Sequence, residues 1–285
     1  MVKSREIYGT FWKVMATIAL LCLSQAGSAQ EAETKEIVID GSTTVGPIAK
    51  AFAEYYMEEN PGVNITVSES GSGNGAKSLI NGTCQIAGMS RFMKENEFSA
   101  AVEKGVLPVA HVVAMDGLAV IVHPSNPVQG LSIEQAHDIY AGKVTNWSGI
   151  GGPDKNIVVI SRDTNSGTYE TFMHLVMDED KMADSAEYVG SNGAVRQRVQ
   201  GTVGAIGYVG LGFADRTVKA LTVENVLPNN QTVASGRYPI ARPLFMFTNG
   251  YPELGSPLHR FVTLHLSKKG QEIVEAIGFV PVTEY

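Results

Sequence analysis

Strand-like and helix-like stretches alternate along most of this 285-residue chain, and this alternation limits its architecture more than any other feature. Short apolar segments rich in Val and Ile, such as residues 36–40, 63–68 and 156–161, are each followed by a stretch of helical periodicity. Such an order is typical of α/β folds, in which helices cover a sheet of mostly parallel strands. The sequence therefore predicts an α/β fold.

The first predicted helix shows the periodicity well. Ile48, Phe52, Tyr55 and Tyr56 follow one helical face, and the segment Asn60-Pro61-Gly62 ends it. We expect this apolar face to pack on the sheet.

A second block of the same kind begins near Gly117, with predicted helices at 133–140 and 169–177. Residues 238–248 then look extended again, and helical patterns at 257–266 and 270–277 end the chain. This order predicts two α/β lobes joined by two extended crossings, near residues 111–117 and 239–246. We assign residues 30–114 and 243–285 to lobe 1, and residues 115–242 to lobe 2.

The N-terminus has the order of a secretory signal peptide. Lys3 and Arg5 precede an apolar run at 14–23, and small residues end the segment at Ala29. The run is about half of the ~20 residues that a membrane-spanning helix needs. We expect residues 1–29 to be cleaved and the protein to be exported to the periplasm. An uncleaved anchor is the alternative, as is a lipid on Cys22, although Leu20 and Leu21 disfavour lipid attachment.

Removal of residues 1–29 takes away three basic residues and one acidic residue, which changes the formal charge from −7 to −9. A chain with this much negative charge is a poor candidate for binding nucleic acid or anionic membrane surfaces. Cys84 is then the only cysteine, so no intramolecular disulfide can form. We interpret it as a small buried apolar residue rather than a nucleophile.

Three segments share one design, in which a strand leads through a turn of Gly, Ser and Thr into a helix. They cover residues 40–44, 70–75 and 162–168. Each places backbone N–H groups and hydroxyls at a helix N-terminus, where an anion is favoured. One such turn alone is more often ordinary helix capping, but three together indicate an anion site. The candidate ligands are Ser42, Thr43, Thr44, Ser72, Ser166, Gly167 and Thr168.

Two arginines follow strands at the same kind of position. Arg162 begins the third segment and offers a planar fork of donors that suits a tetrahedral oxyanion. Ser90 and Arg91 follow the apolar segment 86–89 and could add a hydroxyl and a second guanidinium. A solvated surface arginine is the equally weighted alternative for Arg91.

Seven longer segments are more specific in combination than any one of them is alone. They are GSTTVGPIAKAF, SGSGNGAKSLINGT, IAGMSR, GKVTNW, SRDTNSGTYETF, SNGAVRQRVQGTVGAIGYVGLGF and GQEIVEAIGFVPV. In this order, and over essentially the whole chain after residue 29, the sequence resembles the PstS phosphate-binding subunits of ABC transporters.

The resemblance implies a type II periplasmic binding protein, in which two α/β lobes close on one dehydrated phosphate. It places Thr43 and Thr44 in the first ligand loop, Ser72 in the second, and Arg162, Ser166, Gly167 and Thr168 in the third. Longer family members have an aspartate that accepts a phosphate proton where this chain has Ser90-Arg91.

That departure leaves open how phosphate is distinguished from sulfate. Our candidate for the missing acceptor is Asp116, which lies at a predicted crossing; a turn aspartate before Gly117 is the alternative. A backbone carbonyl or the Ser90 hydroxyl could also accept the proton.

The predicted function is binding of inorganic phosphate and its delivery to the membrane permease subunits of an ABC importer, by a monomer without catalytic residues, cofactor or metal. The alternatives are a binding protein for sulfate, molybdate or tungstate, a secreted phosphatase-like enzyme, and an adhesin. Against an enzyme, the six histidines show no HExxH arrangement, and the chain has no GxSxG or Walker A motif.

Overall fold

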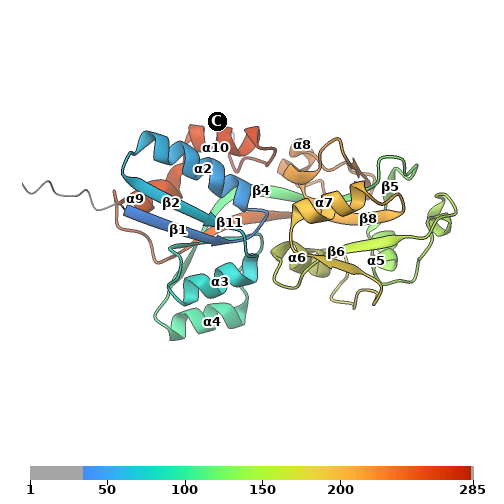
Figure 1. Ribbon diagram of the computed structural model, residues 1–285, viewed down its shortest axis with the longest axis horizontal. Coiled ribbons are helices and arrows are strands. Elements are labelled where there is room, and N and C mark those ends of the chain that lie inside the picture. The colour runs from blue at the N-terminus through green and yellow to red at the C-terminus, as the bar shows by residue number, and fades with distance from the viewer. Residues whose placement is uncertain (1–34, 284–285) are drawn as a thin grey trace, which may run out of the picture. The chain divides into compact units, whose positions relative to one another are not determined.

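A computed structural model describes residues 35–283, so the predicted signal peptide lies outside the described residues (Figure 1). The strands are β1 (Lys35–Gly41), β2 (Val63–Ser68), β3 (Ile86–Met89), β4 (Pro108–Val122), β5 (Gly130–Leu131), β6 (Val158–Arg162), β7 (Glu187–Val189), β8 (Ala205–Gly210), β9 (Lys219–Ala220), β10 (Thr222–Val223) and β11 (Ala241–Asn249).

The α-helices cover the strands. They are α2 (Gly46–Glu59), α3 (Ser72–Ile80), α4 (Glu95–Glu103), α5 (Ile133–Tyr140), α6 (Gly167–Leu175), α7 (Asn192–Gln200), α8 (Asn230–Ala234), α9 (Pro257–Val262) and α10 (Lys268–Ala276). Short 3-10 turns are η1 (Trp147–Ile150), η2 (Leu211–Phe213) and η3 (Thr263–Leu266). The helix predicted at 257–266 is therefore α9 followed by a 3-10 turn. The Thr263 hydroxyl donates to the His259 carbonyl at 2.7 Å where α9 ends.

The main sheet of the described chain has nine strands, and its central path runs β2-β1-β3-β11-β4-β8-β6-β7. The pairs β1–β2, β1–β3, β6–β8 and β6–β7 are parallel. Strand β11 is antiparallel to both of its neighbours, β3 and β4. Strand β4 is also antiparallel to β8 and β9, so the described sheet is mixed. The predicted α/β fold is confirmed, but the expectation of mostly parallel strands is wrong, because both central strands run antiparallel to their neighbours.

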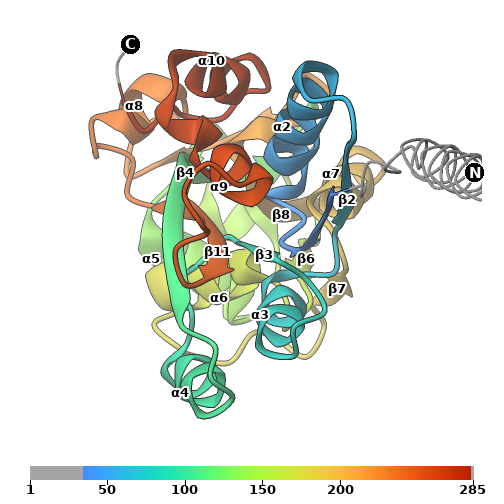
Figure 2. The ribbon, with the colours of Figure 1, turned by 90° about the vertical axis from the view of Figure 1, so that its left-hand side faces the viewer.

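Strands β4 and β11 lie side by side at the centre of this sheet (Figure 2). Residues 108–117 of β4 pair with β11, and residues 118–122 pair with β8. We call the side that contains β1, β2, β3 and β11 the first lobe, and the side that contains β6, β7 and β8 the second lobe. Strand β4 thus passes from one lobe into the other at Gly117–Leu118. The lobe boundaries drawn from the sequence stay a prediction.

Alternating side chains of β4 supply two separate cores in the second lobe, because successive strand residues point to opposite faces. Leu118 and Val120 pack with α5, α6 and α8, whereas Ala119 and Ile121 pack with α7. In the first lobe, α2 and α10 lie on one face and α3 and α4 on the other (Figure 1). Both lobes are thus helix–sheet–helix layers.

A third stretch of chain joins the lobes beside these strands. Val280 pairs with Met115 of β4 through two backbone hydrogen bonds of 2.8 and 3.1 Å. Phe279 packs in the core of the first lobe, and Val280 packs in a core of the second. The sequence predicted only two crossings, because this short segment has no periodicity of its own.

Helix α6 is anchored by an aromatic contact in the second lobe. The ring of Phe172 stacks on Tyr208 with 3.9 Å between centroids and 4° between planes, and also contacts Tyr140. All three side chains are fully buried. The position of the α6 N-terminus therefore depends on this packing.

We expect Phe172→Ala to lower the free energy of unfolding by about 3 to 5 kcal/mol, because it removes a fully buried ring and leaves a cavity. Urea denaturation measures this change. Phe98→Ala in α4 is the matched control, since that ring is 48% exposed. Equal losses in the two variants would contradict the anchoring role of Phe172.

Candidate functional site

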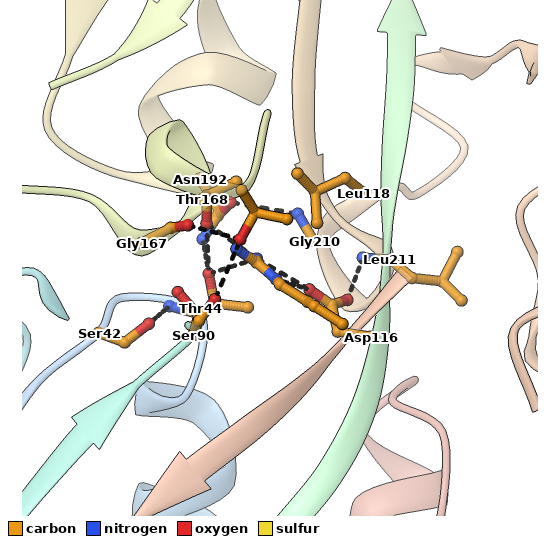
Figure 3. A network of polar contacts seen from close by, with 12 residues as sticks. Ser42, Thr44, Ser90, Asp116, Leu118, Gly167, Thr168, Asn192, Gly210 and Leu211 are labelled. Atoms are coloured by element: carbon orange, nitrogen blue, oxygen red, sulfur yellow. Dashed lines mark hydrogen bonds and ion pairs between the residues drawn. The ribbon is translucent and has the colours of Figure 1, made fainter. Parts of the chain in front are cut away.

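The predicted ligand residues come together where the first and second lobes meet. The loop after β1, the start of α3 and the end of β3 approach the N-termini of α6 and α7 (Figure 3). The buried members of this group are Ser42, Thr43, Thr44, Ser72, Ser90, Arg162, Ser166, Gly167 and Thr168. We call this group, with Arg91 and Asp116 treated separately below, the cradle.

The loops of the first lobe are drawn together by glycine. A Cβ on Gly41 would lie 2.2 Å from the Gly88 carbonyl oxygen, and the Gly41 φ of 135° is one that side chains rarely adopt. The Ser42 N–H donates to that same carbonyl at 2.7 Å. The Ser42 hydroxyl accepts from the Thr44 and Val45 N–H groups at 3.1 and 3.3 Å. Ser42 therefore shapes the loop that presents Thr43 and Thr44.

Helix α6 begins at the cradle and uses Ser166 as its N-cap. The Ser166 hydroxyl accepts from the N–H groups of Thr168 and Tyr169 at 3.1 and 3.3 Å. A Cβ on Gly167 would lie 2.6 Å from the Ser72 hydroxyl and 2.7 Å from that of Ser90. Glycine at this position thus lets the helix N-terminus of the second lobe approach the first lobe closely.

Ser72 and Ser90 form a small hydroxyl pair opposite α6. The Ser90 N–H donates to the Ser72 hydroxyl at 3.1 Å, and the two hydroxyls are 3.3 Å apart. Across the boundary between the lobes, the Thr44 and Thr168 hydroxyls are 3.0 Å apart. These contacts place hydroxyls of both lobes around one position.

Arg162 carries a charge that the cradle does not neutralise. Its side chain is 1% exposed, and its Nη2 donates to the Gly190 carbonyl at 3.0 Å and to the Thr43 hydroxyl at 3.2 Å. Among the described residues its Nη1 has no hydrogen-bond partner, and its closest carboxylate oxygen, on Asp163, is 4.0 Å from Nη2. Burial lowers the pKa of Arg162 to about 10, so the group stays protonated at neutral pH.

Arg242 is a second buried guanidinium, and the sequence reasoning missed it. Its Nη2 donates to the Asp116 carboxylate at 2.9 Å and to the Thr168 hydroxyl at 2.9 Å. It lies in β11 directly opposite Asp116 in β4. An arginine in an otherwise apolar crossing segment was the signal that could have found it.

Asp116 is fully buried, and both of its oxygens have donors. Oδ2 accepts from Nε and Nη2 of Arg242, and Oδ1 accepts from the Leu211 N–H at 2.8 Å. Burial raises the pKa of Asp116, and Arg242 opposes that rise. Its predicted role as acceptor of a phosphate proton stays a prediction, and its described contacts make it the counter-ion of Arg242.

Asn192, the first residue of α7, was also not among the site residues predicted from the sequence. Its Nδ2 donates to the hydroxyls of Thr43 and Thr44 at 3.3 and 2.9 Å, and its Oδ1 accepts from the Gly210 N–H at 3.2 Å. The segment Ser191-Asn192-Gly193 is another strand–turn–helix junction, and this was the available signal.

Arg91 pairs with carboxylates rather than with the cradle hydroxyls. Glu97 accepts from its two terminal nitrogens, each at 2.7 Å, and Glu170 of α6 lies 2.5 Å from Nε. Lys94 also pairs with Glu170, at 3.0 Å. Arg91 therefore bridges the two lobes through carboxylates, and the prediction that it binds the ligand stays untested.

A groove of about 590 Å³ opens beside this bridge, lined in part by Phe92, Tyr169 and Met173. The described residues contain no group of three or more His, Cys, Asp or Glu that could hold a metal ion. Across residues 35–283, no helix is long and apolar enough to cross a membrane.

Comparison with known proteins identifies the family of this chain. A family model described as a PBP superfamily domain matches residues 26–263. The phosphate-binding protein PstS of Bacillus subtilis is 33% identical over 263 residues, which cover 92% of this chain and 85% of that protein. The protein of the same name from Borreliella burgdorferi is 32% identical and covers 95% and 99% of the two chains.

Solved structures show the same fold. A putative phosphate ABC transporter substrate-binding protein from Clostridium perfringens, with bound phosphate, has a TM-score of 0.82 and 33% identity over 87% of this chain and 100% of that one. An ABC-type phosphate transport receptor from Vibrio cholerae has a TM-score of 0.71 and 30% identity, and covers 86% and 99% of the two chains. The predicted type II binding-protein fold is thereby confirmed, and the chain belongs to the PBP superfamily and, within it, to the family of the PstS phosphate-binding proteins.

Proposed function

We propose that this protein binds inorganic phosphate between its two lobes and delivers it to an ABC importer. The observation that supports this best is the buried Arg162 guanidinium, whose Nη1 points at no described partner. A buried cation without a partner is costly, and an anion at this position would remove that cost. Hydroxyls of both lobes surround the same position, so one tetrahedral oxyanion can contact both at once.

The charge of the site fits an anion. Arg162 and Arg242 are each at most 4% exposed, and Asp116 is the carboxylate that bonds directly to either. The site thus has an excess of about one positive charge. The N-terminus of α6 adds the positive end of a helix dipole.

Selectivity for phosphate over sulfate needs a hydrogen-bond acceptor, since phosphate at neutral pH keeps a proton and sulfate does not. The carboxylate oxygens of Asp116 already accept from Arg242 and Leu211. We therefore assign this acceptor to the Ser90 hydroxyl, whose described hydrogen bond is with Ser72. Sulfate, molybdate and tungstate remain the competing ligands to test.

A binding role is also preferred over catalysis. The hydroxyls of Ser72, Ser90 and Ser166 bond to backbone N–H groups or to one another, and none of the described cradle contacts involves a histidine that could act as a base. We further propose that the mature protein acts as a periplasmic monomer, after removal of residues 1–29, and that its partners are the permease subunits of the importer.

Replacing Arg162 by Ala should weaken phosphate binding by about 2 to 5 kcal/mol, the range for removing one partner of a buried charge pair. Calorimetry of the ligand-stripped protein with phosphate and with sulfate measures the loss. Arg198→Ala is the matched control, because that arginine pairs with Glu187 and is 44% exposed. Near-normal affinity in Arg162→Ala would show that the site lies elsewhere.

A second experiment decides between a ligand role and a bridging role for Arg91. Arg91→Gln removes the cation that Glu97 and Glu170 share and leaves Glu170 with Lys94 alone. Phosphate binding should therefore weaken about tenfold. Burial raises the pKa of Glu170, which means that its ionised form is costly in the closed protein. Adding Glu170→Gln should therefore recover part of the lost affinity.

Calorimetry and stopped-flow dissociation rates measure both variants, with Arg196→Gln as a control for loss of a surface arginine that pairs with Asp215. If Arg91 contacts phosphate itself, Glu170→Gln will bring no recovery, and the bridging role is wrong.

A further inference from the structure

We infer that Asn192 is a positioning residue, which fixes the hydroxyls of Thr43 and Thr44 as hydrogen-bond donors toward the bound oxyanion. Asn192 belongs to the second lobe and both threonines belong to the first. The inference rests on the proposed function and goes beyond it, because it explains how neutral hydroxyls acquire a defined polarity when the lobes are together.

The orientation of the Asn192 amide is set by a backbone group. The Gly210 N–H can only donate, and its 3.2 Å contact is with Oδ1 of Asn192, so this oxygen must face β8. The amide NH₂ then faces the loop after β1. Asn192 is fully buried, so water does not compete for either end of the amide.

Thr43 has both of its acceptor positions occupied. A hydroxyl has two lone pairs and one hydrogen. Nδ2 of Asn192 donates to the Thr43 Oγ1 at 3.3 Å, and Nη2 of Arg162 donates to the same oxygen at 3.2 Å. With both lone pairs used, the hydroxyl can form a further hydrogen bond only by donating its own hydrogen.

Thr44 is held in a similar way. Asn192 donates to its Oγ1 at 2.9 Å, the shorter of the two amide contacts, and Nη2 of Arg242 lies 3.5 Å away. The Thr44 hydroxyl is 3.0 Å from that of Thr168, which itself accepts from Arg242 at 2.9 Å. The donors Asn192, Arg162 and Arg242 thus occupy acceptor positions on the two threonine oxygens, so each hydroxyl keeps its hydrogen to donate.

This polarity suits the unprotonated oxygens of an oxyanion, which can only accept. The acceptor for the phosphate proton must then come from the pair of Ser72 and Ser90, whose hydroxyls bond to each other. Because Asn192 reaches across the cleft, its contacts with Thr43 and Thr44 exist only when the lobes are together. The donor polarity is therefore a property of the closed protein.

Double-mutant cycles test the inference. Asn192→Ala should weaken phosphate binding about tenfold, as expected for loss of a buried hydrogen bond that supports a charged ligand. In a Thr43→Val or a Thr44→Val background, the hydroxyl that Asn192 orients is already absent. Asn192→Ala should therefore lower the phosphate affinity by about threefold or less in at least one of these backgrounds. Calorimetry measures the affinities, and thermal melting without ligand checks folding.

Asn192→Asp separates polarity from shape. It keeps the acceptor for Gly210 and the size of the side chain, but its second oxygen can only accept, so it draws the threonine hydrogens away from the ligand and adds negative charge. We expect it to bind phosphate less well than Asn192→Ala does, although it preserves more of the packing. Because the added charge repels the anion under either role, the double-mutant cycles distinguish a positioning role from a merely structural one.

Asn230→Ala is the matched control, since Asn230 is also the first residue of a helix, α8, outside the cradle. Additive losses in both cycles, or better binding by Asn192→Asp than by Asn192→Ala, would overturn the inference while leaving the proposed function intact. If the unaltered protein binds neither phosphate nor another tetrahedral oxyanion, the proposed function and this inference both fail.

Discussion

Two guanidinium groups are buried in one hydroxyl-lined space, and only one of them has a carboxylate within hydrogen-bonding distance. Arg242 pairs with Asp116, whereas Arg162 is held by backbone carbonyls and by Thr43. Carbonyl dipoles orient a guanidinium but do not neutralise it. Burial of this positive charge away from water lowers the free energy of unfolding, and packing in the surrounding cores must offset that loss.

The arrangement of the lobes makes such a site possible. Strands β1, β3 and β6 all end at the cleft, so their loops present hydroxyls and helix N-termini to one position. Glycine at positions 41 and 167 removes the Cβ atoms that would keep these loops apart. The cores on both faces of each lobe then fix the helices whose first residues form the cradle. Packing and ligand binding thus depend on the same few junctions.

The sequence predicted those parts of the site that are encoded locally. A strand, a Gly/Ser/Thr turn and a helix start can be recognised within about ten residues, and this pattern predicted Thr43, Ser72, Arg162 and Thr168 as candidate ligands. Arg242 could not be found in this way, because its role depends on pairing opposite Asp116 across β4 and β11.

Arg91 also shows that position along the chain does not by itself reveal which group a side chain contacts. Its place after a strand resembles that of Arg162, but the carboxylate of Glu170, distant in sequence, engages it. Spacing along the chain identifies which groups are available, and only tertiary contacts determine which of them remain unpaired. The same reason explains why Asn192 was not predicted, since the two threonines to which it donates lie in the other lobe.

The contacts across the cleft suggest why the ligand, rather than the lobes themselves, should determine closure. Several of them join neutral hydroxyls or amides, and such bonds exchange with water at a net gain of about 0.5 to 1.5 kcal/mol each. The pairs of Glu170 with Arg91 and Lys94 add charge, and the burial that raises the pKa of Glu170 opposes their attraction. The lobes therefore hold together only modestly by their own contacts. Water can replace a hydroxyl contact, but it cannot supply the negative charge that Arg162 lacks. An oxyanion supplies that charge only where both lobes contribute donors, so its binding energy favours the closed arrangement over any open one.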